Sequence, residues 1–116
     1  MRLCRALLGC ALLALPWLAQ ANDFPTVDRV LYVQDCMRNN PGPYYEMVNK
    51  CSCALDNMAG DVKFDDYVTM VTVVNAISIG GERGGELRDN ETIKPQIKRY
   101  RELQQKVQKA CFIAPR

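Results

Sequence analysis

Four cysteines, Cys36, Cys51, Cys53 and Cys111, follow an export-type N-terminus in a chain that contains no histidine. An even number of cysteines in a short exported chain is typical of a disulfide framework. A domain of this size buries only somewhat more than about 60 % of its unfolded surface, so crosslinks contribute strongly to its stability. We therefore expect two disulfides to staple the fold.

The N-terminus has the three parts of a secretory signal. Two arginines precede an apolar run over residues 6–19, and residues 19–21 form the small-x-small sequence Ala-Gln-Ala. The run is shorter than the roughly 20 apolar residues that a membrane-spanning helix needs, so we expect no permanent membrane span. The sequence predicts a signal peptide over residues 1–21, cleaved near Ala21, and one domain over residues 22–116. That domain is expected in the periplasm or outside the cell.

A second processing site is conceivable, because the residues before Cys10 also resemble the site of a lipoprotein. A lipoprotein cysteine normally follows the apolar run, whereas here much of the run, residues 11–18, comes after it. Cleavage after Ala21 is therefore favoured, and it removes both Cys4 and Cys10 from the mature chain.

Charge is balanced over the mature chain but divided unevenly along it. Removing Arg2 and Arg5 from the 15 basic residues leaves 13, against 13 acidic residues. Residues 92–116 form a strongly basic segment, in which Glu102 is the one acidic residue. This basic end could contact an anionic surface, or it could face the acidic half of the same molecule. Neutral net charge and an exported location argue against nucleic-acid binding.

The hydrophobic pattern predicts four helices. They cover residues 26–39, residues 43–59, a segment from about Asp65 to before Gly80, and residues from about 92 to about 112. Thr26 is a suitable N-cap for the first helix, Gly60 is a suitable C′ residue for the second, and Asp65-Asp66 can cap the third. The third segment is also rich in β-branched residues, which favour a strand, but its length and preceding acids favour a helix. The expected fold is all-α, a small four-helix bundle stapled by two disulfides.

The helical spacing constrains the disulfide pairing. Cys51 and Cys53 lie two residues apart on the second predicted helix, so their side chains point about 200° apart and do not bond each other. Their partners are then Cys36 and Cys111, in either order. We expect Cys36–Cys53 with Cys51–Cys111, because Cys51 and Cys111 both lie on apolar faces.

The glycine-rich segment over residues 80–85 is expected to open a loop that ends near Asn90. Its backbone amides could hold an anion with help from Arg83 and Arg88, although a flexible connector explains the same glycines. Helix 92–112 carries Lys98 and Arg101 on its basic face. We expect Arg83, Arg88, Lys98 and Arg101 to contact the partner.

The absence of histidine removes His-assisted nucleophiles and His-ligated zinc. The leading hypothesis is a non-enzymatic binding or accessory protein of the bacterial cell envelope, with no cofactor or metal, which binds a protein or another anionic envelope partner. The alternative is a thiol-disulfide or Cu(I)-handling factor that acts through Cys51-Ser52-Cys53.

Overall fold

The computed structural model describes residues 23–115, which form five α-helices and no strand. The all-α class predicted from the hydrophobic pattern is confirmed. The predicted signal peptide, residues 1–21, lies outside the described residues. In chain order the helices are α1 (Thr26–Asn39), α2 (Tyr44–Asp61), α3 (Phe64–Ile77), α4 (Glu82–Arg88) and α5 (Lys94–Ala110).

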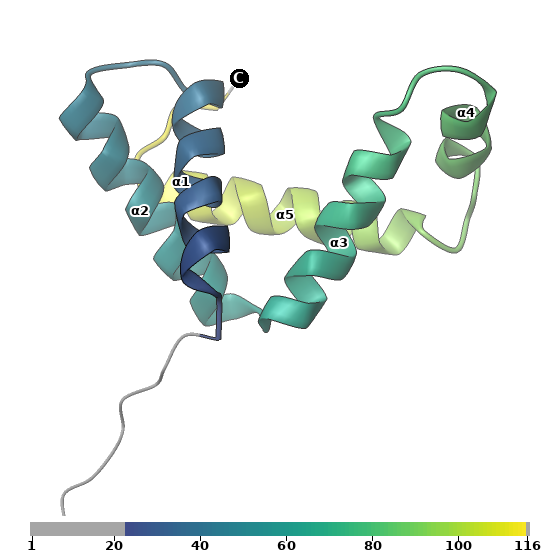
Figure 1. Cartoon of the computed structure of the whole chain (residues 1–116), viewed down its shortest axis with the longest axis horizontal. Helices are drawn as coiled ribbons and strands as arrows, with labels where there is room; N and C mark the ends of the chain where they lie inside the picture. The colour runs from purple at the N-terminus through teal and green to yellow at the C-terminus, as the bar shows by residue number, and fades with distance from the viewer. Residues whose placement is uncertain (1–22, 116) are drawn as a thin grey trace, which may run out of the picture.

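The helices form two pairs joined by a crossing helix (Figure 1). α1 packs against α2 at one end of the molecule, and α3 packs against α4 at the other end. α5 runs across both halves and packs against α2 and α3. The predicted four-helix bundle is not confirmed, because α1 and α3 diverge from a common base as the two arms of an open V.

α2 forms the centre of the core because it packs between α1 and α5. Its buried side chains recur every three or four residues, which places them on one face of the helix. These residues are Met47, Cys51, Ala54, Leu55 and Met58. The other helices and the flanking segments add Phe24, Val62, Met70, Val107, Cys111 and Ile113 to the same cluster. Tyr44, the first residue of α2, lies outside this core and is 67 % exposed.

The segment that precedes α1 is anchored to the start of α3. Phe24 is 4 % exposed, and its ring centroid lies 5.2 Å from that of Phe64 and 5.0 Å from that of Tyr67. The Asp23 carboxylate accepts a hydrogen bond of 2.9 Å from the Phe64 backbone N–H. A carboxylate at this position satisfies a free N–H group and interacts favourably with the positive end of the helix dipole.

At three helix ends the capping residue differs from the sequence-based prediction. Thr26 is the first residue of α1 and Pro25 takes the N-cap position, where its extended backbone leads into the helix. α2 continues through Gly60, because the chain turns away only at the extended and buried Val62. Asp65 and Asp66 lie within the first turn of α3, which begins at Phe64.

The helical prediction for the third segment is confirmed despite its β-branched residues. Met70 of α3 is buried in the core cluster, and α3 packs against α5. The hydroxyl groups of Thr69 and Ser78 donate hydrogen bonds to carbonyls one turn earlier, those of Asp65 and Val74. Packing of this face outweighs the strand propensity of the individual residues.

The two expected disulfides are present, but the predicted pairing is wrong. Cys36 is bonded to Cys51, and Cys53 is bonded to Cys111. The prediction assumed that the apolar faces holding Cys51 and Cys111 meet each other. α2 instead packs between two helices, so Cys51 lies toward α1, while Cys53 on its opposite side reaches the residue that follows α5. The prediction that Cys51 and Cys53 do not bond each other is confirmed.

The two bridges fasten α2 to both of its neighbours. The Cys36–Cys51 bridge closes 15 residues and holds the α1–α2 hairpin. The Cys53–Cys111 bridge closes 58 residues and ties the end of α5 to α2. In the chain-entropy model a bridge stabilises the fold by about 3 kcal/mol for the shorter loop and about 4 kcal/mol for the longer one. Both values are large beside the stability of an ordinary domain, about 5–15 kcal/mol.

Residues 80–90 were expected to form a loop, and they contain the short helix α4. Gly81 precedes this helix with φ +85°, a conformation that favours glycine. Gly84 approaches the end of α3 so closely that a Cβ atom on it would lie 1.7 Å from the Ile79 carbonyl oxygen. Glycine at these two positions allows α4 to fold back against α3.

Candidate functional site

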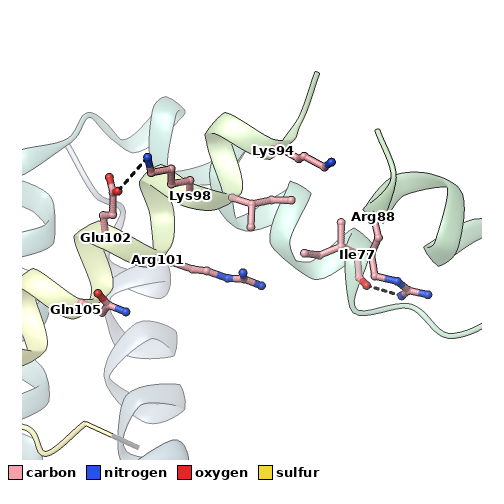
Figure 2. A pocket seen from close by; sticks show the side chains of 8 residues that line it. Ile77, Arg88, Lys94, Lys98, Arg101, Glu102 and Gln105 are labelled. Atoms are coloured by element: carbon pink, nitrogen blue, oxygen red, sulfur yellow. Dashed lines mark hydrogen bonds and ion pairs between the residues drawn. The ribbon is translucent and has the colours of Figure 1, made fainter. Parts of the chain in front are cut away.

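A basic pocket of about 410 Å³ lies where the end of α3, α4 and the first half of α5 meet (Figure 2). Four of its lining side chains are cationic and one is a carboxylate. We call this site the basic pocket. Its lining residues are Ile77, Arg88, Lys94, Ile97, Lys98, Arg101, Glu102 and Gln105.

Most of the basic pocket is built by one face of α5. Lys94, Lys98, Arg101 and Gln105 are spaced by four, three and four residues, which places them on one side of a helix. Ile97 lies among them and is 9 % exposed. The face therefore combines an apolar base with long cationic side chains that reach into solvent.

Arg88 brings α4 into the site and has a structural contact of its own. Its Nη1 donates hydrogen bonds to the carbonyl oxygens of Ile77 at 3.0 Å and Ile79 at 3.3 Å (Figure 2 shows the first). These carbonyls lie at the C-terminal end of α3, where backbone acceptors lack helical partners and a cation is favourable. Arg88 thus joins α4 to α3, and its guanidinium is directed at these carbonyls and away from the cations of α5 (Figure 2).

The cations of the pocket differ in how far they are neutralised. Lys94 pairs with Glu91, and Lys98 lies 3.8 Å from the Glu102 carboxylate. The Lys98–Glu102 side chains are 77 % and 64 % exposed, so this pair contributes little stabilisation. Arg101 has no hydrogen-bond or ion-pair partner among residues 23–115. In Figure 2 its side chain extends from α5 in the direction of Ile77.

Three of the four predicted contact residues come together here. Arg88, Lys98 and Arg101 line the same pocket, although Arg88 is on α4 and the others are on α5. Arg83 is exposed on α4 and does not line the pocket. Lys94 was not among the predicted contacts, but its position four residues before Lys98 on a helix is a signal that could have identified it.

Guanidinium and ammonium groups clustered in this way can bind a carboxylate or a phosphate. An arginine side chain can form two parallel hydrogen bonds to one anionic group, and lysine supplies a mobile point charge. Arg101 is free of competing contacts within the described part of the chain, so it can turn toward a ligand without breaking an ion pair. The apolar floor of Ile77 and Ile97 can contact the hydrocarbon part of the same ligand.

Cys51 and Cys53 form disulfides with different elements of the fold. Cys51 is bonded to Cys36 of α1, and Cys53 is bonded to Cys111, which follows α5. Cys51 is 0 % exposed and Cys111 is 2 % exposed. The Asn57 amide lies beside the second bridge, with Nδ2 3.6 Å from Cys53 Sγ and 3.4 Å from Cys111 Sγ. Among residues 23–115 all four cysteines are therefore in crosslinks, and this region holds no group of three or more potential metal-ligating side chains.

Within residues 23–115, none of the helices combines the length and the apolar character required for crossing a lipid bilayer. No protein-family model, curated protein or solved structure shows significant similarity to the chain. Its function is therefore inferred from its own residues.

Proposed function

We propose that the chain is a small exported, non-enzymatic binding protein of the bacterial cell envelope, and that its basic pocket captures an acidic segment of a partner protein. The observation that carries this proposal is Arg101. This guanidinium lies in a pocket with three other cations and lacks a partner within the described chain. Because Arg101 is exposed and unpaired within the described chain, its guanidinium can bind a carboxylate without breaking an ion pair.

An acidic peptide side chain fits the chemistry of the pocket. The carboxylate of a glutamate or aspartate can pair with Arg101 and Lys94, while its methylene groups contact the isoleucines of the floor. Arg88 lines the site from α4, where its guanidinium is held by the carbonyl oxygens of Ile77 and Ile79. Several weakly held cations around one apolar base would contribute affinity together, and they would also accelerate association with an acidic partner.

The disulfides support the exported location. Two disulfide crosslinks, each with one buried cysteine, are typical of proteins that fold in an oxidising compartment. The use of all four mature cysteines as staples also favours a binding role over a thiol-exchange role. A protein that acts through surface contacts needs a rigid scaffold, and the bridges hold α2 to both neighbouring elements.

Fluorescence anisotropy with a labelled glutamate-rich peptide tests the proposal. Lys94→Gln/Arg101→Gln removes two pocket cations, and Arg99→Gln/Lys109→Gln is the matched control, since it removes two exposed α5 cations that do not line the pocket. We expect the pocket variant to bind about tenfold more weakly, which corresponds to about 1.4 kcal/mol, and the control to bind nearly as the wild type. Equal losses in both variants, or tighter binding to anionic lipid vesicles than to the peptide, would overturn the proposal.

A further inference from the structure

The open V encloses a second site, on the inner sides of its two arms. A pocket of about 420 Å³ lies between α1 and α3, and α5 forms its floor. Figure 1 shows these two helices separating above α5. We call this site the inner cleft. Its lining includes two carboxylates and three tyrosines but no lysine or arginine, and it shares no residue with the basic pocket.

The tyrosines form a connected cluster to which each of the three helices contributes one ring. The ring centroid of Tyr67 lies 6.2 Å from that of Tyr32 and 6.4 Å from that of Tyr100. Burial is the main cause that raises the pKa of each of these hydroxyls, so the three side chains stay neutral over the physiological range. The cluster therefore offers aromatic faces and phenolic oxygens without positive charge.

The negative field of two aspartates reaches this cluster from α1. After burial and the neighbouring tyrosines, the carboxylates of Asp28 and Asp35 both contribute to the raised pKa of Tyr67. Asp28 has no ion-pair partner among the described residues. Asp35 lies 3.1 Å from Arg38, but both side chains of that pair are more than half exposed, so solvent screens it strongly. The inner cleft is thus negative, with Asp28 unpaired among the described residues and Asp35 paired only with the exposed Arg38.

Negative charge above aromatic faces is the environment that an ammonium or guanidinium group prefers. A cation near a tyrosine ring is attracted by the electron density of the ring face, and a carboxylate nearby adds a direct charge interaction. The walls also carry apolar surface, with Leu31 50 % and Val68 41 % exposed. The side-chain amide of Asn75 on the same lining can bond a peptide backbone, whereas Gln104 Nε2 already donates a hydrogen bond of 2.9 Å to the Tyr100 hydroxyl.

We propose that the inner cleft binds a cationic peptide segment of a partner protein and places a lysine or arginine side chain over the tyrosine cluster, between Asp28 and Asp35. Charge complementarity selects this occupant, because the cleft contains carboxylates, aromatic faces and no cation. The apolar walls favour a peptide over a free small cation, since they contact the chain on either side of the charged residue. The site is independent of the basic pocket.

The test uses the purified oxidised protein and a labelled arginine-rich peptide, with the same peptide carrying glutamine for arginine as a neutral probe. Asp28→Asn/Asp35→Asn keeps side-chain volume while removing the charge. Asp65→Asn/Asp66→Asn is the matched control, since it neutralises two exposed aspartates outside the cleft. We expect the arginine peptide to bind the cleft variant at least about tenfold more weakly than the control, a difference of about 1.4 kcal/mol.

Two further measurements distinguish a cationic peptide from other possible ligands of the inner cleft. Spermidine, a free polyamine, is expected to bind much more weakly than the arginine peptide, because it lacks a backbone and apolar side chains. Light scattering is expected to give the same molecular mass for the wild type and the cleft variant. Equal binding of the neutral peptide or of spermidine would overturn the proposal. A change of mass in the cleft variant would overturn it in favour of a second copy of the chain.

Discussion

The carboxylate of Asp23 accepts a hydrogen bond from the backbone N–H of Phe64, 41 residues away in sequence, and so caps the start of α3. The neighbouring Phe24 fills the base of the V against α3. These two residues directly follow the predicted cleavage region. The segment before α1 is therefore part of the core at the base of the V.

Truncation of Phe24 tests this anchor. Phe24→Ala is expected to lower the free energy of unfolding by about 3 kcal/mol, because it removes a buried ring that contacts two other aromatic side chains. Phe112→Ala is the control, since Phe112 is 83 % exposed and its loss should change stability by less than about 0.5 kcal/mol. Urea denaturation followed by circular dichroism measures both, and similar values for the two variants would contradict a structural role for the N-terminal segment.

The disulfide pairing can be tested with a single substitution. Cys36→Ser leaves one free thiol, and the structure predicts that it is Cys51, because Cys53 remains bonded to Cys111. Alkylation in denaturant without reductant, followed by fragment-ion mass spectrometry, identifies the labelled residue. Wild-type protein treated in the same way should carry no label. A label on Cys53 in the variant would contradict the pairing, and a label on Cys51 or Cys53 in the wild type would favour the thiol-exchange alternative.

Alanine at the two adjacent glycines of α4 should have opposite effects. Gly84→Ala brings a Cβ atom into the Ile79 carbonyl, and we expect it to destabilise the fold by about 2 kcal/mol. Gly85→Ala meets only Arg88 Nη2 at 3.9 Å, so it should stabilise the helix by about 0.5 kcal/mol. Thermal unfolding monitored by circular dichroism distinguishes the two. Equal effects would mean that α4 does not pack against the end of α3.

Stability should fall as the pH rises above about 10, the ordinary pKa of tyrosine in an unfolded chain. Burial raises the pKa of Tyr32, Tyr67 and Tyr100, so the folded state holds protons that the unfolded state has already released. The contribution of these groups is complete below that pH and is lost as the pH climbs toward their folded values. Urea midpoints between pH 8 and pH 11 measure the decline.

A tyrosine substitution separates this effect from other alkaline titrations. Tyr32→Phe removes one buried hydroxyl and should make the decline in the urea midpoint shallower. Tyr45→Phe is the control, because Tyr45 is 80 % exposed, and it should leave the slope unchanged. If the urea midpoints of the wild type and Tyr32→Phe fell in parallel with rising pH, the Tyr32 hydroxyl would have the same pKa in the folded and the unfolded state.

Features of the fold that depend on the sequence of a single helix could be predicted. α1 has the predicted bounds, Thr26–Asn39, because the Asn-Pro-Gly-Pro sequence after it excludes a continued helix. The apolar face of α2 was also identified by its spacing. The disulfide pairing was not, because it depends on which helix packs on each side of α2. α4 was missed because its glycines disfavour a helix until Gly84 contacts Ile79.

The two candidate sites also differ in how much of each could be predicted from the sequence. Lys98 and Arg101 of the basic pocket were predicted, since they share one face of one helix. Arg88 was predicted as a loop residue, and only the position of α4 brings it to the same pocket. The inner cleft was not predicted, because Asp28, Tyr67 and the other lining residues come from four helices whose arrangement cannot be derived from helical spacing alone.

The most direct test of the central claim is an NMR titration of the oxidised protein with the glutamate-rich peptide. The basic pocket predicts that the largest amide shifts fall on residues 94–105 of α5 and around Arg88, and that Arg101→Glu abolishes them while Arg99→Glu does not. Shifts spread evenly over the surface, or equal losses in the two variants, would contradict an anion-binding pocket at this place.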